Sequence, residues 1–164
     1  MVNDLPETKP AVYIGLDQSY SGFGFVTLYD DRPDDVILWN FTKNKGGDSE
    51  RLLIIYDMLV HAFWTLQKDF TCHIAMEGYA HGSRFNREKM GELGGIVKLA
   101  VYDVFEKEPF IIAPTVVKKF VTGKGVATKE QMVAGVEAKW QAGITDHNIA
   151  DAYGIAQYLK SQYV

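Results

Sequence analysis

The pattern of apolar and polar positions predicts three strands early in the chain. Residues 11–17, 23–29 and 36–42 are short runs rich in Val, Ile, Leu, Phe and Tyr, which favour strands. Residues 21–24 carry the Ser and Gly of a turn, and residues 30–35 form a loop of Asp, Arg and Pro. Strands joined by connections this short are expected to pair as an antiparallel meander.

Helical periodicity begins near residue 48 and then alternates with strands. Apolar residues recur at helical spacing from Leu52 to Leu66, and Asp48 or Ser49 is the expected N-cap. Further strands are predicted at 71–76 and 110–113, and further helices at 86–106, 115–121, 128–140 and 148–160. Thr128, followed three residues later by Gln131, is the expected capping box of the helix at 128–140. This order predicts an α/β fold with a mixed five-stranded sheet, three strands antiparallel and then two parallel, covered by helices.

Length and composition indicate one globular domain. The chain has 164 residues, of which 47% are hydrophobic. Residues 1–10 are polar and are expected to be a flexible leader before a single domain at 11–164. No apolar run reaches the roughly 18 residues of a membrane span. The single cysteine, Cys72, excludes an intrachain disulfide and favours a cytoplasmic location.

The net charge of −4 argues at first against a nucleic-acid partner. Basic residues are nevertheless concentrated in one part of the chain, because residues 79–131 hold nine Lys and Arg against six Asp and Glu. Some acidic residues are also candidate metal ligands, whose charge a bound cation would offset. A local basic face is therefore compatible with an acidic protein.

Candidate chemistry lies in carboxylates at the edges of apolar runs. Asp17 ends the run that starts at Ala11, Glu77 ends Ile74-Ala-Met-Glu, and Asp151 lies in Ala150-Asp-Ala-Tyr-Gly-Ile-Ala. If the strands at 11–17 and 71–76 are parallel neighbours, Asp17 and Glu77 emerge at one edge of the sheet. Buried carboxylates are costly unless they are paired or bind a cation, and such sets hold ions such as Mg²⁺. We therefore expect a two-metal site for phosphodiester hydrolysis.

Four motifs resemble the RuvC-type Holliday junction resolvases, which have the ribonuclease H-like fold. Ile14-Gly-Leu-Asp-Gln-Ser-Tyr-Ser-Gly-Phe-Gly-Phe-Val is similar to their first strand and turn, and Met76-Glu-Gly-Tyr to their second acidic motif. Residues 115–131 are similar to their lysine-bearing segment, and Asp146-His-Asn-Ile-Ala-Asp-Ala-Tyr-Gly-Ile-Ala to their C-terminal acidic motif. The motifs stand in the family's order over residues 11–160, and the compact length suggests a phage-type member.

The resemblance implies a crossover junction endodeoxyribonuclease that works as a homodimer with two Mg²⁺ (or Mn²⁺) per active site. Its substrates would be four-way junctions and other branched DNA, such as three-way and flap structures, cut to leave a 5′-phosphate and a 3′-hydroxyl. The metal ligands would be Asp17, Glu77 and Asp151, and Lys118 and Lys129 would contact phosphates. Further DNA contacts would come from Tyr79 as a wedge at the branch point, Phe85 as the alternative wedge, Arg84, Arg87, Lys119 and Lys124.

The fourth metal ligand stays open among Asp146, His147 and Asn148. Family members carry an acidic residue or a histidine three or four positions before the last aspartate, and here these positions hold Asn148 and His147. Residues three and four apart share a helix face, whereas Asp146 lies five before Asp151. Asp146 is therefore expected to contribute only as a residue before the helix or at its N-cap.

Two other functions fit parts of the sequence. Gly15-Leu-Asp-Gln-Ser-Tyr-Ser-Gly-Phe-Gly also resembles the phosphate loop of actin-like ATPases and sugar kinases. Those proteins need two such domains, and this chain has no Gly-x-x-x-x-Gly-Lys-Ser/Thr motif. The other alternative is a non-catalytic branched-DNA-binding protein, which would bind junctions without cutting them in Mg²⁺ or Mn²⁺.

Overall fold

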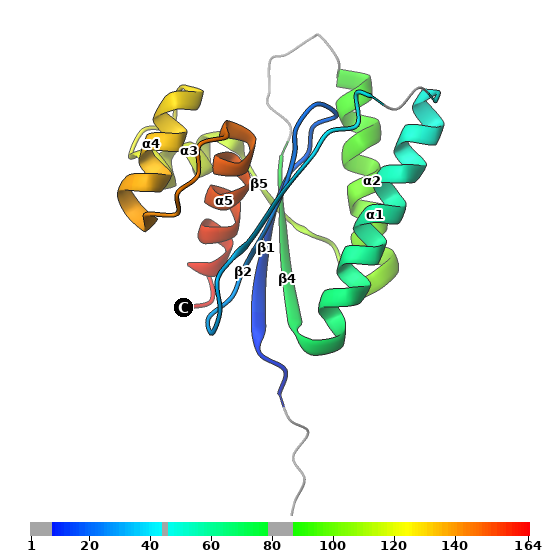
Figure 1. Ribbon diagram of the computed structural model, residues 1–164, viewed down its shortest axis with the longest axis horizontal. Helices are drawn as coiled ribbons and strands as arrows, with labels where there is room; N and C mark the ends of the chain where they lie inside the picture. The colour runs from blue at the N-terminus through cyan, green and yellow to red at the C-terminus, as the bar shows by residue number, and fades with distance from the viewer. Residues whose placement is uncertain (1–7, 44–45, 79–86) are drawn as a thin grey trace, which may run out of the picture.

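The computed structural model describes residues 8–43, 46–78 and 87–164, which form a mixed five-stranded sheet with helices on both faces (Figure 1). The sheet order is β3-β2-β1-β4-β5, in which β1 pairs antiparallel with β2 and parallel with β4. The predicted fold class is therefore confirmed. The strands are β1 (Ala11–Asp17), β2 (Phe23–Leu28), β3 (Asp35–Trp39), β4 (Thr71–Glu77) and β5 (Phe110–Ile112). The helices are α1 (Asp48–Asp69), α2 (Arg87–Phe105), α3 (Pro114–Thr122), α4 (Lys129–Trp140) and α5 (His147–Lys160).

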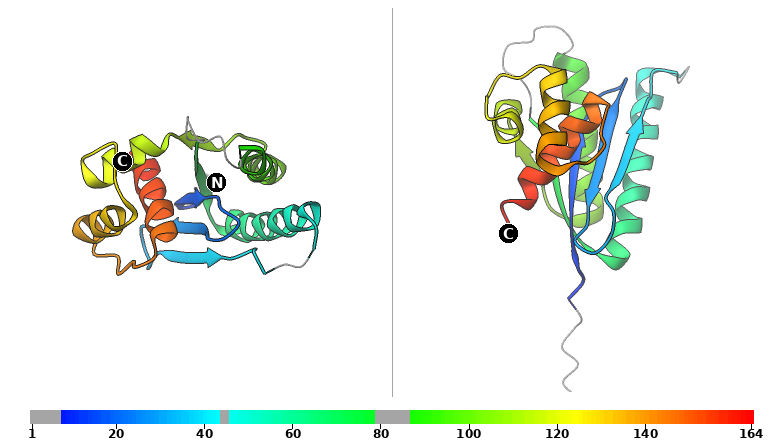
Figure 2. Two further views of the ribbon diagram at one scale, coloured as in Figure 1. Left: turned by 90° about the horizontal axis from the view of Figure 1, so that it is seen from above. Right: turned by 60° about the vertical axis from the view of Figure 1, so that its left-hand side comes forward.

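The sheet separates two hydrophobic cores, because side chains alternate between its faces. Helices α1 and α2 cover one face, and α3, α4 and α5 cover the other (Figure 2). On β1, Ile14 and Leu16 belong to the core under α1 and α2, whereas Tyr13 belongs to the core under α5. Both faces are thus buried, which explains why β1, β2 and β4 are almost continuously apolar in sequence.

Helix α5 lies unusually close to the sheet, over two glycines. A Cβ atom on Gly15 would stand 2.2 Å from the main-chain oxygen of Ala152, and one on Gly24 would stand 2.6 Å from that of Asn148. Real side chains do not approach so closely, so both positions require glycine while α5 stays where it is. These two residues of β1 and β2 set the distance between the helix and the sheet.

Two expected boundaries differ from the structure for local reasons. The N-cap of α1 is Gly47, without a side-chain cap, rather than Asp48 or Ser49. Asp48 instead lies 3.6 Å from the guanidinium of Arg51 one turn later. The third strand ends at Trp39 rather than at 42, because the Phe41 amide leaves the ladder and donates to the Tyr20 main-chain oxygen at 2.8 Å. The predicted capping box at the start of α4 is confirmed, since Thr128 and Gln131 satisfy each other's main-chain amides.

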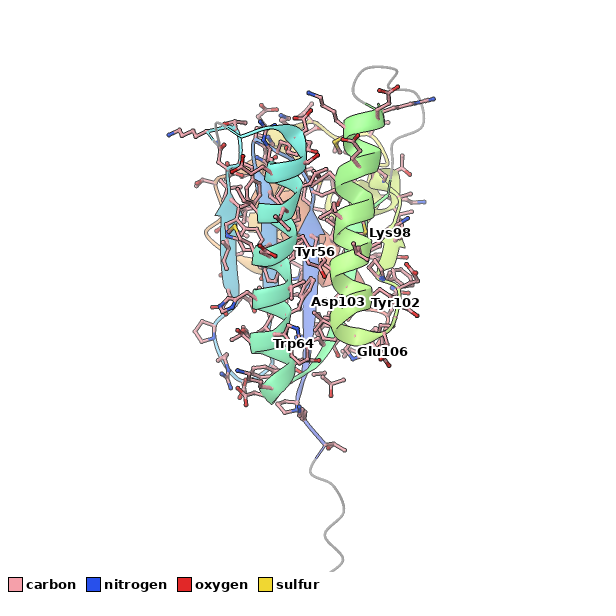
Figure 3. The ribbon with its side chains drawn as sticks, turned by 90° about the vertical axis from the view of Figure 1, so that its right-hand side faces the viewer. Tyr56, Trp64, Lys98, Tyr102, Asp103 and Glu106 are labelled. Atoms are coloured by element: carbon pink, nitrogen blue, oxygen red, sulfur yellow. The ribbon has the colours of Figure 1, made fainter. Side chains whose placement is uncertain are left out.

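The outward side of α1 and α2 keeps apolar surface exposed. Trp64 on α1 and Tyr102 on α2 are each about half exposed, at 51% and 55% (Figure 3). The two helices are joined at the surface by the Tyr56 hydroxyl, which donates to Asp103 at 2.8 Å. None of the helices in the described residues combines the length and apolar content needed to cross a bilayer.

The glycine contacts predict a stability effect. We expect Gly15→Ala to destabilise the protein by about 1–3 kcal/mol or more, because the added methyl group overlaps main-chain atoms of α5 that cannot turn aside. Urea unfolding of the purified protein measures the change. Gly91→Ala is the matched control: it lies exposed in α2 with nothing within 4 Å of the added atom, so it should be neutral or stabilise by up to ~1 kcal/mol. Equal urea midpoints of unfolding for wild type and Gly15→Ala would contradict the close approach of α5 to the sheet at Gly15.

Candidate active site

Asp17 and Glu77 end neighbouring parallel strands. In the ladder between β1 and β4, Leu16 pairs with Met76, so the next residue on each strand is a carboxylate. Gly15 and Ala75, two positions earlier, both lie in contact with the α5 side of the sheet. Because alternate residues share a face, Asp17 and Glu77 lie next to each other on the α5 face, at the carboxyl edge of the sheet.

Helix α5 brings the third carboxylate to the same edge. Gly24, the cross-strand partner of Asp17, lies under the main-chain oxygen of Asn148 and the Cβ of Ala152. The first turns of α5 therefore cover the end of β1. Asp151 lies within these turns, and its charge acts on both Asp17 and Glu77. The three acidic residues predicted as metal ligands are thus brought together from three separate elements.

Burial and mutual repulsion make ionisation of this cluster unfavourable. Asp17 is only 8% exposed, and burial raises its pKa well above the usual range, with further increases from the charges of Glu77, Asp151 and Asp146. Burial and the charge of Asp151 raise the pKa of Glu77 to about 7. Burial also raises the pKa of Asp151. The carboxylates therefore form one electrostatically coupled group.

The donor atoms of this group fit a hard divalent cation. Carboxylate oxygens are the preferred ligands of Mg²⁺ and Mn²⁺, and a bound cation would reverse the repulsion between them. In the part of the chain that the structure describes, no three acidic, histidine or cysteine side chains form a group that encloses one ion. Mg²⁺ does not need such a cage, because it is usually held by one or two carboxylates together with waters and substrate phosphates. The coupled carboxylates therefore suit hydrated divalent cations, which keep water molecules as part of their ligand set.

The start of α5 determines what the three fourth-ligand candidates do. Asp146 is the N-cap, and its Oδ1 accepts hydrogen bonds from the main-chain amides of Asn148 and Ile149 at 2.8 and 3.2 Å. His147 is the first helical residue, one position earlier than predicted, and its charge lowers the pKa of Asp151. The Asn148 side chain lies against the turn between β1 and β2, because a Cβ on Gly22 would stand 2.2 Å from its Nδ2. Of the three, Asp146 and His147 act electrostatically on the cluster.

Two of the predicted lysines lie at the cluster. Lys118, half-buried on α3, lowers the pKa of Glu77 and Asp151. Lys129, the first residue of α4, lowers that of Asp17 and Asp151. Lys129 and His147 also border a groove of about 810 Å³ between α4 and residues 143–147. The cluster therefore has cationic side chains at its rim.

The remaining DNA-binding candidates lie elsewhere or outside the described residues. Lys124 lines a second groove between α3 and α4, and Lys119 is exposed on α3. Arg87 is the exposed first residue of α2. Tyr79, Arg84 and Phe85 lie outside the described residues.

Sequence reasoning missed one residue at this site, Gln18. Its side chain is 4% exposed, and its Nε2 donates to the main-chain oxygen of Glu77 at 2.6 Å. Its Oε1 is buried and has no hydrogen-bond partner in the described residues, an arrangement that costs about 1–3 kcal/mol. The available signal was a polar residue directly after Asp17, but sequence alone does not show that it turns inward.

Comparisons with known proteins identify the fold. No protein-family model and no curated protein sequence matches the chain. Among solved structures, RuvC of Thermus thermophilus is similar at 18% identity, with a TM-score of 0.67 over 93% of this chain and 96% of that one. RuvC of T. thermophilus in complex with a Holliday junction substrate matches at 19% identity and a TM-score of 0.69, with the same coverage.

A third structure extends the likeness to a eukaryotic protein. The yeast mitochondrial Holliday junction resolvase Ydc2 is 18% identical, with a TM-score of 0.54 over 98% of this chain and 84% of that one. Identities this low establish the architecture alone. The chain has the ribonuclease H-like fold of RuvC.

Proposed function

We propose that the protein is a structure-selective, metal-dependent endonuclease that resolves Holliday junctions and cuts other branched DNA. The observation that carries this proposal is the coupled set of Asp17, Glu77 and Asp151 at the carboxyl edge of the sheet. The fold adds support, because the similar structures are RuvC, once with a Holliday junction substrate, and a mitochondrial Holliday junction resolvase. A buried acidic cluster with cationic side chains at its rim suits phosphodiester hydrolysis.

The chain's own residues supply binding and positioning. Asp17, Glu77 and Asp151 would hold the cations, and Asp146 or His147 would complete the set. Mg²⁺ or Mn²⁺ held by these carboxylates would supply Lewis-acid chemistry for the attack of water on the phosphate and for the departure of the leaving oxygen. Lys118 and Lys129 act as point charges that attract the scissile phosphate and hold it beside the carboxylates.

The path of the DNA beyond the scissile phosphate follows basic residues. Lys119 and Lys124 on α3 and the following loop, with Arg87 at the start of α2, would bind flanking phosphates. Tyr79 or Phe85 would stack on unpaired bases at the branch point, beside Arg84. These contacts explain how a chain of net charge −4 binds a polyanion.

A homodimer would allow two symmetric cuts across a junction. The exposed apolar residues Leu99 and Tyr102 lie one turn apart on α2 and are 53% and 55% exposed. Tyr102 lies on the side of the molecule formed by α1 and α2, which faces the viewer in Figure 3. Exposed apolar surface of this kind is typical of protein interfaces, so α2 is the proposed dimer helix.

The function is tested with labelled four-way, three-way, flap and duplex DNA. We expect wild type to cut the branched substrates in Mg²⁺ or Mn²⁺, and Asp17→Asn or Glu77→Gln to abolish cleavage while junction binding is retained. Each substitution removes a cation-binding oxygen and keeps the shape of the side chain. Glu108→Gln, an exposed change remote from the cluster, is the control and should cut normally. Junction binding by wild type without any cleavage would favour the non-catalytic alternative, and full activity in Asp17→Asn would exclude the proposed metal site.

The raised pKa of Glu77 predicts a pH-dependent stability gain. We expect Glu77→Gln to stabilise the cation-free protein at pH 8, by up to about 3 kcal/mol. Glutamate has an ordinary pKa of 4.5 and folded Glu77 one of about 7, so the folded state binds the extra proton between these values. The contribution of Glu77 to the free energy of unfolding of wild type therefore falls as pH rises from 4.5 to about 7, and it stays low at higher pH.

Thermal unfolding in EDTA from pH 4.5 to 8 measures this effect. The gain in melting temperature of Glu77→Gln over wild type should be largest at pH 8. It should nearly vanish at pH 4.5, where the Glu77 carboxyl is protonated in the folded protein. Glu108→Gln should show no such trend. An equal advantage at every pH would rule out charge repulsion as its cause.

The proposed dimer face is tested by Leu99→Glu. We expect sedimentation velocity to show a monomer, because a buried unpaired carboxylate would destabilise the interface. Junction assays should then show single nicks in place of paired cuts. Val36→Glu, at an aliphatic residue of β3 that is 44% exposed, is the matched control and should leave the dimer intact. A dimeric Leu99→Glu variant would place the interface elsewhere.

A further inference from the structure

Gln18 joins the two strand ends that carry the first two carboxylates. The last paired residues of the β1–β4 ladder are Leu16 and Met76. Beyond them, the Gln18 Nε2 donates to the main-chain oxygen of Glu77 at 2.6 Å. This side-chain bond continues the connection between the strands past the end of the ladder, directly beside Asp17.

The bond acts at the strand ends that carry two carboxylates. Asp17 and Glu77 directly follow Leu16 and Met76, the last pair of the ladder between β1 and β4. Gln18 joins the two strand ends beyond that pair, through the main-chain oxygen of Glu77 and not through its carboxylate. A bond of this kind fixes the starting point of the side chain while its donor atoms stay available for a cation.

The other half of the amide has a different environment. Gln18 Oε1 is buried and has no partner within the described ranges, although buried acceptors are almost always hydrogen-bonded. Gln18 directly follows Asp17, and its side chain bonds to the main chain of Glu77, so its amide lies at the strand ends that carry both carboxylates. A DNA phosphate offers only acceptors. A hydrated divalent cation, in contrast, carries water molecules that donate hydrogen bonds.

We propose that Gln18 is a positioning residue of the cation site. Its Nε2 holds Glu77 beside Asp17, and its Oε1 accepts a hydrogen bond from a water molecule carried by the divalent cation. This inference rests on the proposed function, because it assigns Gln18 to the same acidic cluster. It explains why position 18 holds a glutamine, whose Oε1 has no partner among the described residues, where an apolar side chain would otherwise be expected.

The test measures cation binding by the full chain without DNA. Isothermal titration calorimetry with Mg²⁺ and with Mn²⁺ compares wild type, Gln18→Met and Thr27→Val. Methionine keeps the volume of glutamine and removes both hydrogen-bonding atoms. We expect Gln18→Met to bind each cation about 10- to 100-fold more weakly. Thr27, 1% exposed on β2, is the matched buried polar control, and its variant should bind as wild type does.

Melting temperatures in EDTA and in Mg²⁺ separate positioning from simple stability. In EDTA, the melting temperature of Gln18→Met should be close to that of wild type. Added Mg²⁺ should raise the melting temperature of the variant less than that of wild type. Unchanged cation affinity in Gln18→Met overturns the proposal, whether or not the variant melts earlier. If that variant does not fold, Gln18→Asn, whose shorter amide cannot reach Glu77, carries the same expectation. Failure of wild type to bind either cation overturns the proposed metal site itself, and the Gln18 role with it.

Discussion

The close contact between α5 and the sheet is the constraint on which the site depends. Main-chain atoms of the helix occupy the space where Gly15 and Gly24 would carry side chains. A helix held by longer side chains would sit farther away, and Asp151 would no longer influence Asp17 and Glu77. Because the approach is between backbones, the position of Asp151 is determined by the packing of α5 itself. Such rigid support suits a site whose ligands must stay in register.

The same packing brings buried negative charges close together, which lowers the stability of the folded protein. Four carboxylates influence one another, and burial raises the pKa of at least three of them. A fold selected only for stability would place neutral side chains there, since unpaired buried charge is costly. Local violations of this kind are expected at functional sites. The positive charges of Lys118 and Lys129 offset part of this repulsion, because they lower the pKa of the carboxylates that they face.

The sheet and most helices were predictable because their patterns are local. Continuous apolar runs gave β1 and β4, and the capping box located the start of α4 within one residue. The proximity of Asp17 and Glu77 was predictable, because each ends an apolar run and the two runs form neighbouring parallel strands. The end of the third strand was not predictable, since it depends on a hydrogen bond between Phe41 and the distant Tyr20. Gln18 was missed for the same reason, because its role depends on a bond to a residue 59 positions away.

Asp146 is the N-cap of α5, so helical spacing does not determine where its side chain lies relative to Asp151. Helical spacing counts against a residue five positions before Asp151, but that argument applies only to residues inside the helix. Asp146 precedes the helix, and both of its hydrogen bonds are made by Oδ1. Capping therefore leaves Oδ2 free of these bonds, and Asp146 already acts on Asp17 and Asp151 through its charge. Asn148, whose amide lies against the turn at Gly22, is less well placed. The geometry therefore favours Asp146 and His147 over Asn148 as the fourth member of the cluster.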